Sequence, residues 1–398
     1  MSESYSVQFG LFDAKENKQL IALGVERELK TTSFEALNEF VEKHADEYRF
    51  GFLSYDVKNN IEALASKNKD FVCFPELFFF VPEVVVKVEN SEMIYLKGKK
   101  NAKTQKAIVE LLNNSQANKS HVQLRPQFDK KTYLEKVQKL LDHIQRGDVY
   151  EVTFCQCFYA ENAFLHPKAV FRDVIYKAQA PFSCFVQLDD KYLISASPER
   201  FIKKTANTIL SQPIKGTARR GKTTFEDEHQ KEKLKNSRKE RAENVMIVDL
   251  VRNDLSRIAR KHSVKVDELF GIYTFPTVHQ MISTVSAELK PGVSFEAILR
   301  ALFPMGSMTG APKISAMQLI EKHENFKRGL FSGSVGYIKP NGDFDFNVII
   351  RSILYNATSK NLICPVGGAI TIQSNPEGEY EECLLKMEAL AKILNADE

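Results

Sequence analysis

Residues 240–251 read Glu240-Arg241-Ala242-Glu243-Asn244-Val245-Met246-Ile247-Val248-Asp249-Leu250-Val251 and join a charged segment directly to an apolar one. At about 100° per residue, a helix through this stretch places both glutamates on one face with the apolar residues Ile247, Leu250, Val251 and Ile258. A buried carboxylate pair is costly unless a cation neutralises it. The stretch therefore predicts either a cation site or two glutamates on a solvated helix face.

A second acidic segment with the same spacing lies near the end of the chain. Residues 377–394 predict a helix whose apolar stripe consists of Tyr380, Cys383, Leu384, Met387, Leu390 and Leu394. Glu379, Glu382 and Lys386 follow one edge of that stripe. Four carboxylates from two helices would suit a hard divalent cation with oxygen ligands, Mg²⁺ above all. The alternative is that both pairs are ordinary surface glutamates.

Three glycine-bearing segments are candidates for ligand contact. Residues 213–221 contain Lys215 in an expected tight turn, where a partly desolvated amine becomes nucleophilic. Residues 306–313 precede a helix, so their N–H groups suit an anion. Residues 366–370 place two adjacent glycines at an expected strand start, where a ligand approaches the backbone closely. Each segment is also compatible with a plain turn, and Lys215 with an exposed turn lysine.

Arg351 follows the apolar segment at residues 346–350, which predicts a strand. An arginine in such surroundings requires an anionic partner. That partner is either a carboxylate of a ligand or an internal salt bridge.

The composition excludes several classes of protein. With 43% hydrophobic residues among 398, the chain can bury a substantial core, which excludes global disorder. Its 55 basic and 51 acidic residues give a net charge of +4 without a basic arm, so no nucleic-acid partner is expected. No apolar run reaches the ~18 residues of a membrane span. The six cysteines lie in apolar surroundings and the first residues show no signal-peptide pattern, which predicts a cytoplasmic protein without membrane contact.

A polar segment at residues 97–123, rich in lysine and asparagine, is the best candidate for an internal boundary. It separates an N-terminal part, residues 1–120, from residues 121–398. In the second part, strand and helix patterns alternate without a fixed repeat, which excludes a solenoid.

Several of these segments together resemble the chorismate-utilising enzymes. The resemblance covers residues 133–394 and depends on motifs in the family's order: Ser197-Pro198-Glu199-Arg200, Pro213-Ile214-Lys215-Gly216-Thr217, residues 247–254, residues 306–313 and residues 329–333. It implies an α+β fold, a large single domain of two packed antiparallel β-sheets flanked by helices. Residues 1–120 would form a subdomain woven into that fold, and residues 121–398 the chorismate-binding catalytic region.

The resemblance also implies an activity. In the turn that contains Lys215, members that make 4-amino-4-deoxychorismate for 4-aminobenzoate and folate synthesis carry lysine, whereas members that make anthranilate usually carry alanine. Mg²⁺-dependent amination of chorismate is therefore expected. Anthranilate formation for tryptophan synthesis is the alternative, and a silent binding subunit is a third reading. Because the sequence contains no Gly-x-Cys-x-Gly glutaminase elbow, a separate glutamine amidotransferase subunit is expected to supply ammonia.

By resemblance, each candidate residue receives a role. Glu199 would protonate the departing C4 hydroxyl of chorismate while Lys215 attacks C2, and ammonia would then add at C4 and expel the lysine. The implied magnesium ligands are Glu240, Glu243, Glu379 and Glu382. The implied substrate contacts are Thr217, Thr309, Arg351, Gly367, Gly368, Lys386 and Gln280. Gln280 is a departure, because relatives generally carry a histidine at this position.

Overall fold

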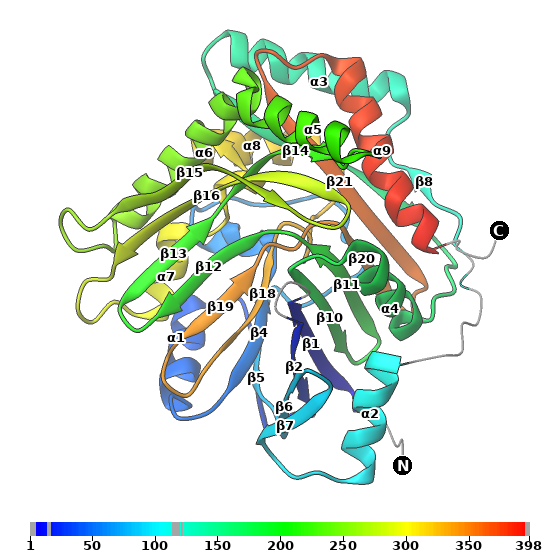
Figure 1. Cartoon of the computed structure of the whole chain (residues 1–398), viewed down its shortest axis with the longest axis vertical. Helices are drawn as coiled ribbons and strands as arrows, with labels where there is room; N and C mark the ends of the chain where they lie inside the picture. Colours follow the sequence, from blue (N-terminus) through cyan, green and yellow to red (C-terminus); the bar gives the residue numbers. More distant parts are fainter. Residues whose placement is uncertain (1–4, 14–16, 114–119, 121, 395–398) are drawn as a thin grey trace.

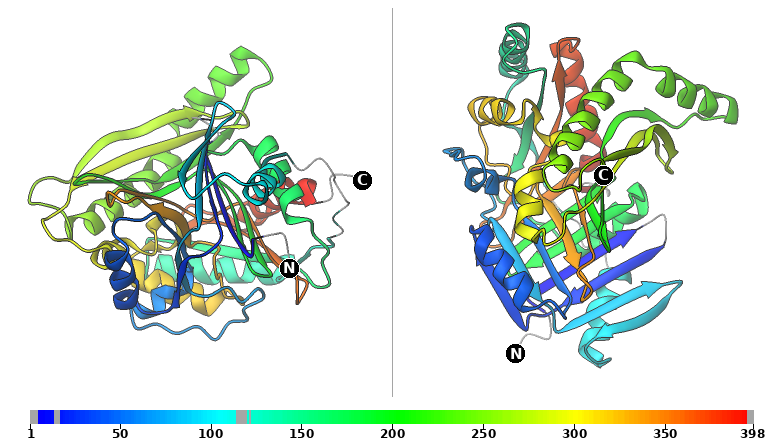
Figure 2. Two further views of the ribbon diagram at one scale, coloured as in Figure 1. Left: turned by 90° about the horizontal axis from the view of Figure 1, so that it is seen from below. Right: turned by 90° about the vertical axis from the view of Figure 1, so that its left-hand side faces the viewer.

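The computed structural model describes residues 5–13, 17–113, 120 and 122–394. It contains two antiparallel β-sheets that pack face to face, with helices around them (Figure 1). This confirms the predicted α+β class. The right-hand view of Figure 2 shows that the strands of the N-terminal part lie at one end of the molecule and the last helix, α9, toward the other.

The first sheet is eleven-stranded and contains strands from both parts of the chain. Along the sheet the strands are β17 (Gly310–Ala311), β9 (Glu151–Ala160), β21 (Asn361–Thr371), β20 (Ser352–Asn356), β11 (Lys191–Ser197), β10 (Phe182–Leu188), β1 (Val7–Asp13), β2 (Lys18–Leu23), β6 (Val84–Glu89) and β7 (Glu92–Lys97), and β8 (Arg125–Pro126) pairs with β9. Because β1 pairs with β10, residues before the polar segment continue a sheet formed by residues after it.

The second sheet is ten-stranded and is built in the same interleaved way. Its strands are β14 (Ile214–Arg219), β16 (Val278–Glu288), β13 (Thr208–Gln212), β12 (Arg200–Thr205), β19 (Phe344–Asn347), β18 (Ser334–Ile338), β4 (Arg49–Leu53), β5 (Leu77–Val81) and β3 (Arg27–Thr31), with β15 (Lys265–Thr274) paired to β16. The pairing of β4 with β18 joins the two parts of the chain here as well.

Phenylalanine rings fill the space between the two sheets. Phe9 of β1 lies in the first sheet, and its ring centroid is 4.9 Å from that of Phe80 and 6.3 Å from that of Phe52, both in the second sheet. All three side chains are fully buried. Burial of aromatic side chains on this scale contributes roughly 1.5–3 kcal/mol each. The sheets are therefore fixed relative to one another by a core to which the first 120 residues contribute directly.

Nine α-helices and two 3₁₀ helices are assigned in the described part of the chain. They are α1 (Phe34–Lys43), η1 (Tyr55–Asn60), α2 (Ala102–Asn113), α3 (Lys130–Gln145), α4 (Pro167–Ala178), α5 (Thr224–Asn236), α6 (Arg238–Ser256), α7 (Phe295–Leu302), η2 (Gly306–Met308), α8 (Lys313–His323) and α9 (Pro376–Leu394). Helix α9 packs on β21, and α6 packs on β14 and β16. No helix among these is long and apolar enough to cross a membrane.

Three local expectations are corrected by the structure. Gly367 and Gly368 lie inside β21, paired with β9, and not at a strand start, because the strand continues through the glycines as far as Thr371. Lys215 lies in strand β14 and not in a tight turn. Leu384 of the expected apolar stripe is 40% exposed, since the packed face of α9 is narrower than its sequence pattern.

Candidate active site at the seam between the sheets

Two helices begin at the end of the molecule drawn at the top of Figure 1, and each carries a glutamate pair in its first two turns. Ser237 caps α6 by accepting a hydrogen bond from the backbone N–H of Glu240 (3.3 Å). Glu243 follows one turn later, and Glu379 and Glu382 lie in the first two turns of α9 with the same spacing. Carboxylates are favoured near a helix N-terminus because the unpaired N–H groups and the helix dipole are positive there.

Burial makes three of these glutamates reluctant to ionise. It raises the pKa of Glu243 to about 7, and it raises the pKa values of Glu240 and Glu379 above the ordinary value. The negative charge of Glu382 raises the pKa of both Glu240 and Glu379 further, so carboxylates of α6 and α9 lie close enough to repel one another. Oε1 of Glu243 is buried and accepts no hydrogen bond from any described residue. The nearest cation to this oxygen is Nζ of Lys239 at 3.9 Å, beyond hydrogen-bond distance. These three buried carboxyl groups form a donor set that fits a hard cation.

Glu382 differs from the other three because a lysine neutralises it. Its carboxylate lies 2.7 Å from Nζ of Lys386, and although burial opposes the shift, this lysine holds the pKa of Glu382 below its ordinary value. Lys386 also donates to the carbonyl oxygen of Gly367 at 2.6 Å. A Cβ at Gly368 would lie 3.0 Å from Oε2 of Glu379, so the glycine leaves room for these carboxylates beside β21. The predicted lysine and both predicted glycines therefore lie together.

Within the described residues, no three His, Cys, Asp or Glu side chains are gathered closely enough to hold a metal ion as they stand. The predicted Mg²⁺ site thus stays a prediction, supported by the chemistry of the donor set.

The predicted nucleophile, Lys215, joins the two sheets. It lies in β14 of the second sheet, and its Nζ donates to Oε1 of Glu151 in β9 of the first sheet at 2.5 Å. The pairing of β14 with β16 shifts register between Ile214 and Thr217, and Gly216 has a φ of +92°. Such a bulge bends the strand and re-aims its side chains, and the positive φ favours glycine. The bulge directs Lys215 away from the regular ladder and toward Glu151.

Lys215 is held in its charged form in this arrangement. Burial alone would lower its pKa, but attraction to Glu151 and the hydrogen bond between them outweigh that effect, and the pKa is raised. Glu243 and Glu199 act in the same direction. A lysine in this state is an ammonium group and not a nucleophile, so attack on a substrate requires that its proton is first removed.

Glu199 has the properties of a general acid near neutral pH. It lies between β11 and β12, where the chain passes from the first sheet to the second, and it is 5% exposed. Burial raises its pKa to about 7, against the opposing effect of a 2.7 Å hydrogen bond from the hydroxyl of Ser307. A carboxyl group with this pKa is partly protonated at pH 7 and can donate its proton.

This pKa leads to a first prediction. Because Glu199 must be protonated to act as an acid, turnover at constant free ammonia should fall as pH rises above about 7, approaching tenfold per pH unit. Glu199→Gln should lower turnover by about 10²–10⁴-fold and abolish this decrease above pH 7. Initial rates over pH 6–9, with total ammonium adjusted to hold free ammonia constant, measure both effects. A wild-type rate unchanged over this range would contradict the assignment.

Arg351 reaches the same site from the first sheet. It lies in the turn before β20 with a φ of +50°, and its backbone carbonyl accepts from the N–H of Ala196. The side chain is accessible to solvent, yet protein surrounds it closely enough to lower the pKa of its guanidinium, with Glu199 opposing that shift. No salt bridge to Arg351 is found among the described residues. This favours the ligand carboxylate over the internal ion pair among the two predicted partners.

The three remaining predicted contacts lie on neighbouring elements. Thr217 is exposed on β14 and pairs with Gln280 of β16. Gln280 is 1% exposed, and its Oε1 accepts no hydrogen bond within the described ranges. Thr309 is fully buried, and its hydroxyl donates to the carbonyl oxygen of Met305 at 3.0 Å. Its backbone N–H donates to Gly306 (3.1 Å) and its carbonyl oxygen accepts from Thr153 (2.8 Å), so Thr309 stabilises the turn before α8 and only a lone pair of its hydroxyl is left for a ligand.

Two residues of the site were not among those predicted. Glu151, the partner of Lys215, lies in a strand whose sequence shows only alternating residue types, and its importance depends on a contact 64 positions away. Ser307, the partner of Glu199, is 108 positions from it. Neither pairing has a local sequence signal, although Ser307 lies within a motif quoted for the resemblance.

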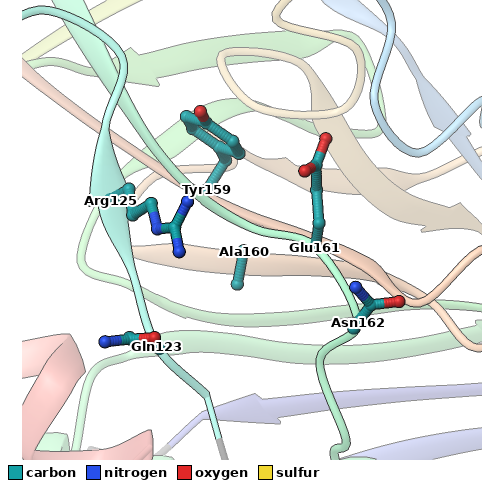
Figure 3. Close-up of a pocket in the computed structure, with 6 residues that line it drawn as sticks. All are labelled: Gln123, Arg125, Tyr159, Ala160, Glu161 and Asn162. Atoms are coloured by element: carbon teal, nitrogen blue, oxygen red, sulfur yellow. The ribbon is translucent and has the colours of Figure 1, made fainter.

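A small hollow of about 200 Å³ lies elsewhere, at the opposite end of β9 from Glu151. Figure 3 shows its lining residues, Gln123, Arg125, Tyr159, Ala160, Glu161 and Asn162. At about 3.3 Å per residue, Tyr159 is roughly 26 Å along the strand from Glu151. The hollow is therefore not part of the candidate site.

The chain is similar to known proteins in both sequence and fold. Residues 6–392 match the family described as chorismate binding enzyme. The chain belongs to the chorismate binding enzyme family. Among curated members it is 34% identical over 361 residues to aminodeoxychorismate synthase component 1 of Escherichia coli strain K12, which covers 86% of this chain and 76% of that protein. It is also 34% identical over 372 residues to the chloroplastic aminodeoxychorismate synthase of Arabidopsis thaliana, of which it spans only 40%.

A solved structure shares this fold. Anthranilate synthase component I from Streptococcus pneumoniae TIGR4 superposes with a TM-score of 0.78 over 97% of this chain and 92% of that one. Its sequence identity of 23% supports a shared fold and no shared activity. Together with the family match, this confirms both the predicted membership and the predicted two-sheet architecture.

Proposed function

We propose that this chorismate binding enzyme aminates chorismate to 4-amino-4-deoxychorismate, with ammonia as the nitrogen donor. One observation carries the proposal: Lys215 is buried at the seam between the sheets, in a cluster that also contains an acid, Glu199, and an arginine, Arg351. Relatives named aminodeoxychorismate synthase match most of the chain, which supports the same assignment. Anthranilate formation, the alternative, has no use for a lysine nucleophile at this position.

The reaction divides one difficult substitution into two. Glu199 protonates the C4 hydroxyl, which leaves as water, while the amine of Lys215 attacks C2 and the two ring double bonds shift. Ammonia then attacks C4, the double bonds shift back, and Lys215 departs as an amine. Each displacement proceeds through the conjugated ring, so no step requires direct displacement of a hydroxide ion.

Cationic groups and backbone hold the substrate, which is a dianion at neutral pH. Arg351 binds one carboxylate through the fork of its guanidinium, and Lys386 with the backbone of Gly367 and Gly368 lies beside the other. Mg²⁺, held by Glu240, Glu243, Glu379 and Glu382, would supply the positive charge that fixes that second carboxylate. Oε1 of Glu243, which accepts no hydrogen bond from the described residues and lies 3.9 Å from Nζ of Lys239, is the donor atom that best fits this role.

Among the described residues, no cysteine is suited to act as a glutaminase nucleophile. Five of its six cysteines are buried, and the sixth, Cys73, is exposed but has a pKa raised by partial burial and by Asp70. A glutaminase nucleophile requires a thiolate, which these environments disfavour. We therefore propose that ammonia comes from a separate glutamine amidotransferase subunit.

This proposal predicts which nitrogen source the purified chain uses. With chorismate and Mg²⁺ it should form product from ammonium salts. At fixed total ammonium its rate should increase with pH, because free ammonia is the nucleophile, until Glu199 loses the proton that it must donate. Glutamine should give less than about 1% of that rate. A coupled assay with each nitrogen source measures the ratio, and turnover of glutamine by the isolated chain would contradict the requirement for a partner.

A further inference from the structure

In the pair formed by Lys215 and Glu151, only one of the two carboxylate oxygens has a hydrogen-bond partner among the described residues. Glu151 is fully buried, and only its Oε1 has a partner; Oε2 is buried without one among the described residues. The anionic form of Glu151 is therefore stabilised by a single hydrogen bond from Lys215. Burying an ion pair is costly, and the cost is greater when one carboxylate oxygen has no hydrogen-bond partner.

A second buried pair in the same molecule shows the contrast. Glu324 and Arg328 are both about 1% exposed, but both oxygens of Glu324 are satisfied, by Arg328 at 2.6 and 2.9 Å and by the backbone N–H of Cys155 at 2.8 Å. Arginine does not give up its proton in proteins. The pair of Glu324 with Arg328 is therefore a permanent structural link, whereas the pair of Lys215 with Glu151 can transfer a proton.

We propose that Glu151 is a catalytic residue that accepts the proton of Lys215 and so generates the amine that attacks the substrate. The inference rests on the proposed function, since it assigns a base to its nucleophile. No other carboxylate within hydrogen-bond distance of Lys215 Nζ is found in the described part of the chain. Gln280, on the strand next to β14, has no titratable group and cannot serve as the base.

The protons balance over a full cycle. Transfer converts the ammonium and carboxylate pair into an amine and a neutral acid, with no proton exchanged with solvent. Attack at C2 gives a secondary ammonium while Glu199 releases its proton to the departing hydroxyl as water. After ammonia attacks C4, Lys215 leaves as a neutral amine and recovers its proton from Glu151. The new C4 ammonium returns one proton to Glu199, so chorismate and ammonia yield product and water.

This mechanism gives the first half-reaction a distinctive pH dependence. Because the pair keeps the same number of protons, the fraction in the reactive form does not change with pH while the pair remains singly protonated. The charged groups that face it are Glu243 and Glu240 from α6, Glu382 from α9, and Glu199 from the β11–β12 connection. In Glu151→Gln the lysine must release its proton to solvent, so its reactive fraction increases tenfold per pH unit below its pKa.

The experiment measures the covalent adduct on Lys215, without ammonia. Wild-type protein and Glu151→Gln are mixed with chorismate and saturating MgCl₂ at pH 5.0–8.0, quenched in acid over time, and the mass of the Lys215 peptide is followed. At pH 6 the variant should form adduct at least about 10²-fold more slowly, and its ratio to wild type should rise with pH. The ratio cancels the titration of Glu199, which is common to both proteins.

Two further proteins make the outcome independent of folding defects. Glu151→Asp keeps a carboxylate and should keep the wild-type pH profile at a reduced rate. Asp254→Asn breaks another buried lysine pair, the 2.6 Å contact between Asp254 and Lys313. Asp254 lies about 16 Å along α6 from Glu243, so this variant should leave the pH profile unchanged. If Glu151→Gln does not fold, the wild-type protein alone still tests the proposal. Its rate of adduct formation should not change between pH 5.0 and 6.5.

The inference is overturned if Glu151→Gln matches wild type in rate and profile, or if the wild-type rate rises tenfold per pH unit between pH 5.0 and 6.5. The failure of the proposed function would look different. In that case wild-type protein supplied with ammonium would not make 4-amino-4-deoxychorismate at all, whatever the behaviour of the variants.

Discussion

Lys215→Ala is expected to lower the formation of 4-amino-4-deoxychorismate by on the order of 10³-fold or more, as the loss of other catalytic nucleophiles does. The reason is that alanine cannot form the covalent intermediate, and ammonia would have to displace the C4 hydroxyl without it. Chorismate binding should persist, because Arg351 and Lys386 are unchanged. Steady-state turnover with ammonium, together with chorismate titration by calorimetry, separates the two effects.

The matched control for this variant is Lys222→Ala, which removes an exposed lysine from the loop after β14. It should leave turnover within about twofold, because no predicted contact involves it. Full activity of Lys215→Ala would remove the covalent step from the mechanism. Loss of chorismate binding in that variant would instead make Lys215 a binding residue.

Glu243→Gln is expected to raise the Mg²⁺ concentration for half-maximal activity by at least about tenfold, since it exchanges a charged oxygen donor for a neutral amide. Glu382→Gln should act in the same direction by a smaller factor, because Lys386 already neutralises part of that charge. The control is Glu381→Gln, which removes the same charge from an exposed position on α9. Unchanged Mg²⁺ dependence in Glu243→Gln would exclude this residue as a ligand.

The same carboxylate gives a test that needs no turnover. The pKa of Glu243 is about 7 in the folded protein and ordinarily about 4.3, so without metal the free energy of unfolding should fall as pH rises between these values. Mg²⁺ binds the ionised form and should reverse this loss. Thermal unfolding should therefore show a larger stabilisation by Mg²⁺ at pH 8 than at pH 6, and a smaller one in Glu243→Gln. Equal stabilisation at both pH values would contradict the site.

The helical part of the site was predictable from sequence because its signals are local. The spacing of Glu240 and Glu243 predicted a helix that the structure assigns as α6, and the expected helix at residues 377–394 differs from α9 by one residue. Caps and apolar periodicity act within a few residues, so they are visible without knowledge of the fold. The position of Glu199 and Lys215 in one site, in contrast, depended on the resemblance to a known family.

What could not be predicted depends on long-range pairing. The first sheet alone joins β1 to β10 and β9 to β21, and no local pattern specifies which strands become neighbours. The partners of the acid and the nucleophile, Ser307 and Glu151, are set by that topology. The two glycines of β21 were expected at a strand start, but they lie within the strand, where a Cβ at Gly367 would collide with Phe154 and Cys155 of β9 and one at Gly368 would crowd Glu379.

We expect this chorismate binding enzyme to aminate chorismate at C4 and to retain the enolpyruvyl group. The most direct measurement is the product formed by the purified protein from chorismate, MgCl₂ and an ammonium salt, separated by liquid chromatography and identified by mass and ultraviolet spectrum. We expect 4-amino-4-deoxychorismate, a non-aromatic product that keeps all carbon atoms of chorismate. Anthranilate with released pyruvate, or no consumption of chorismate, would contradict the claim.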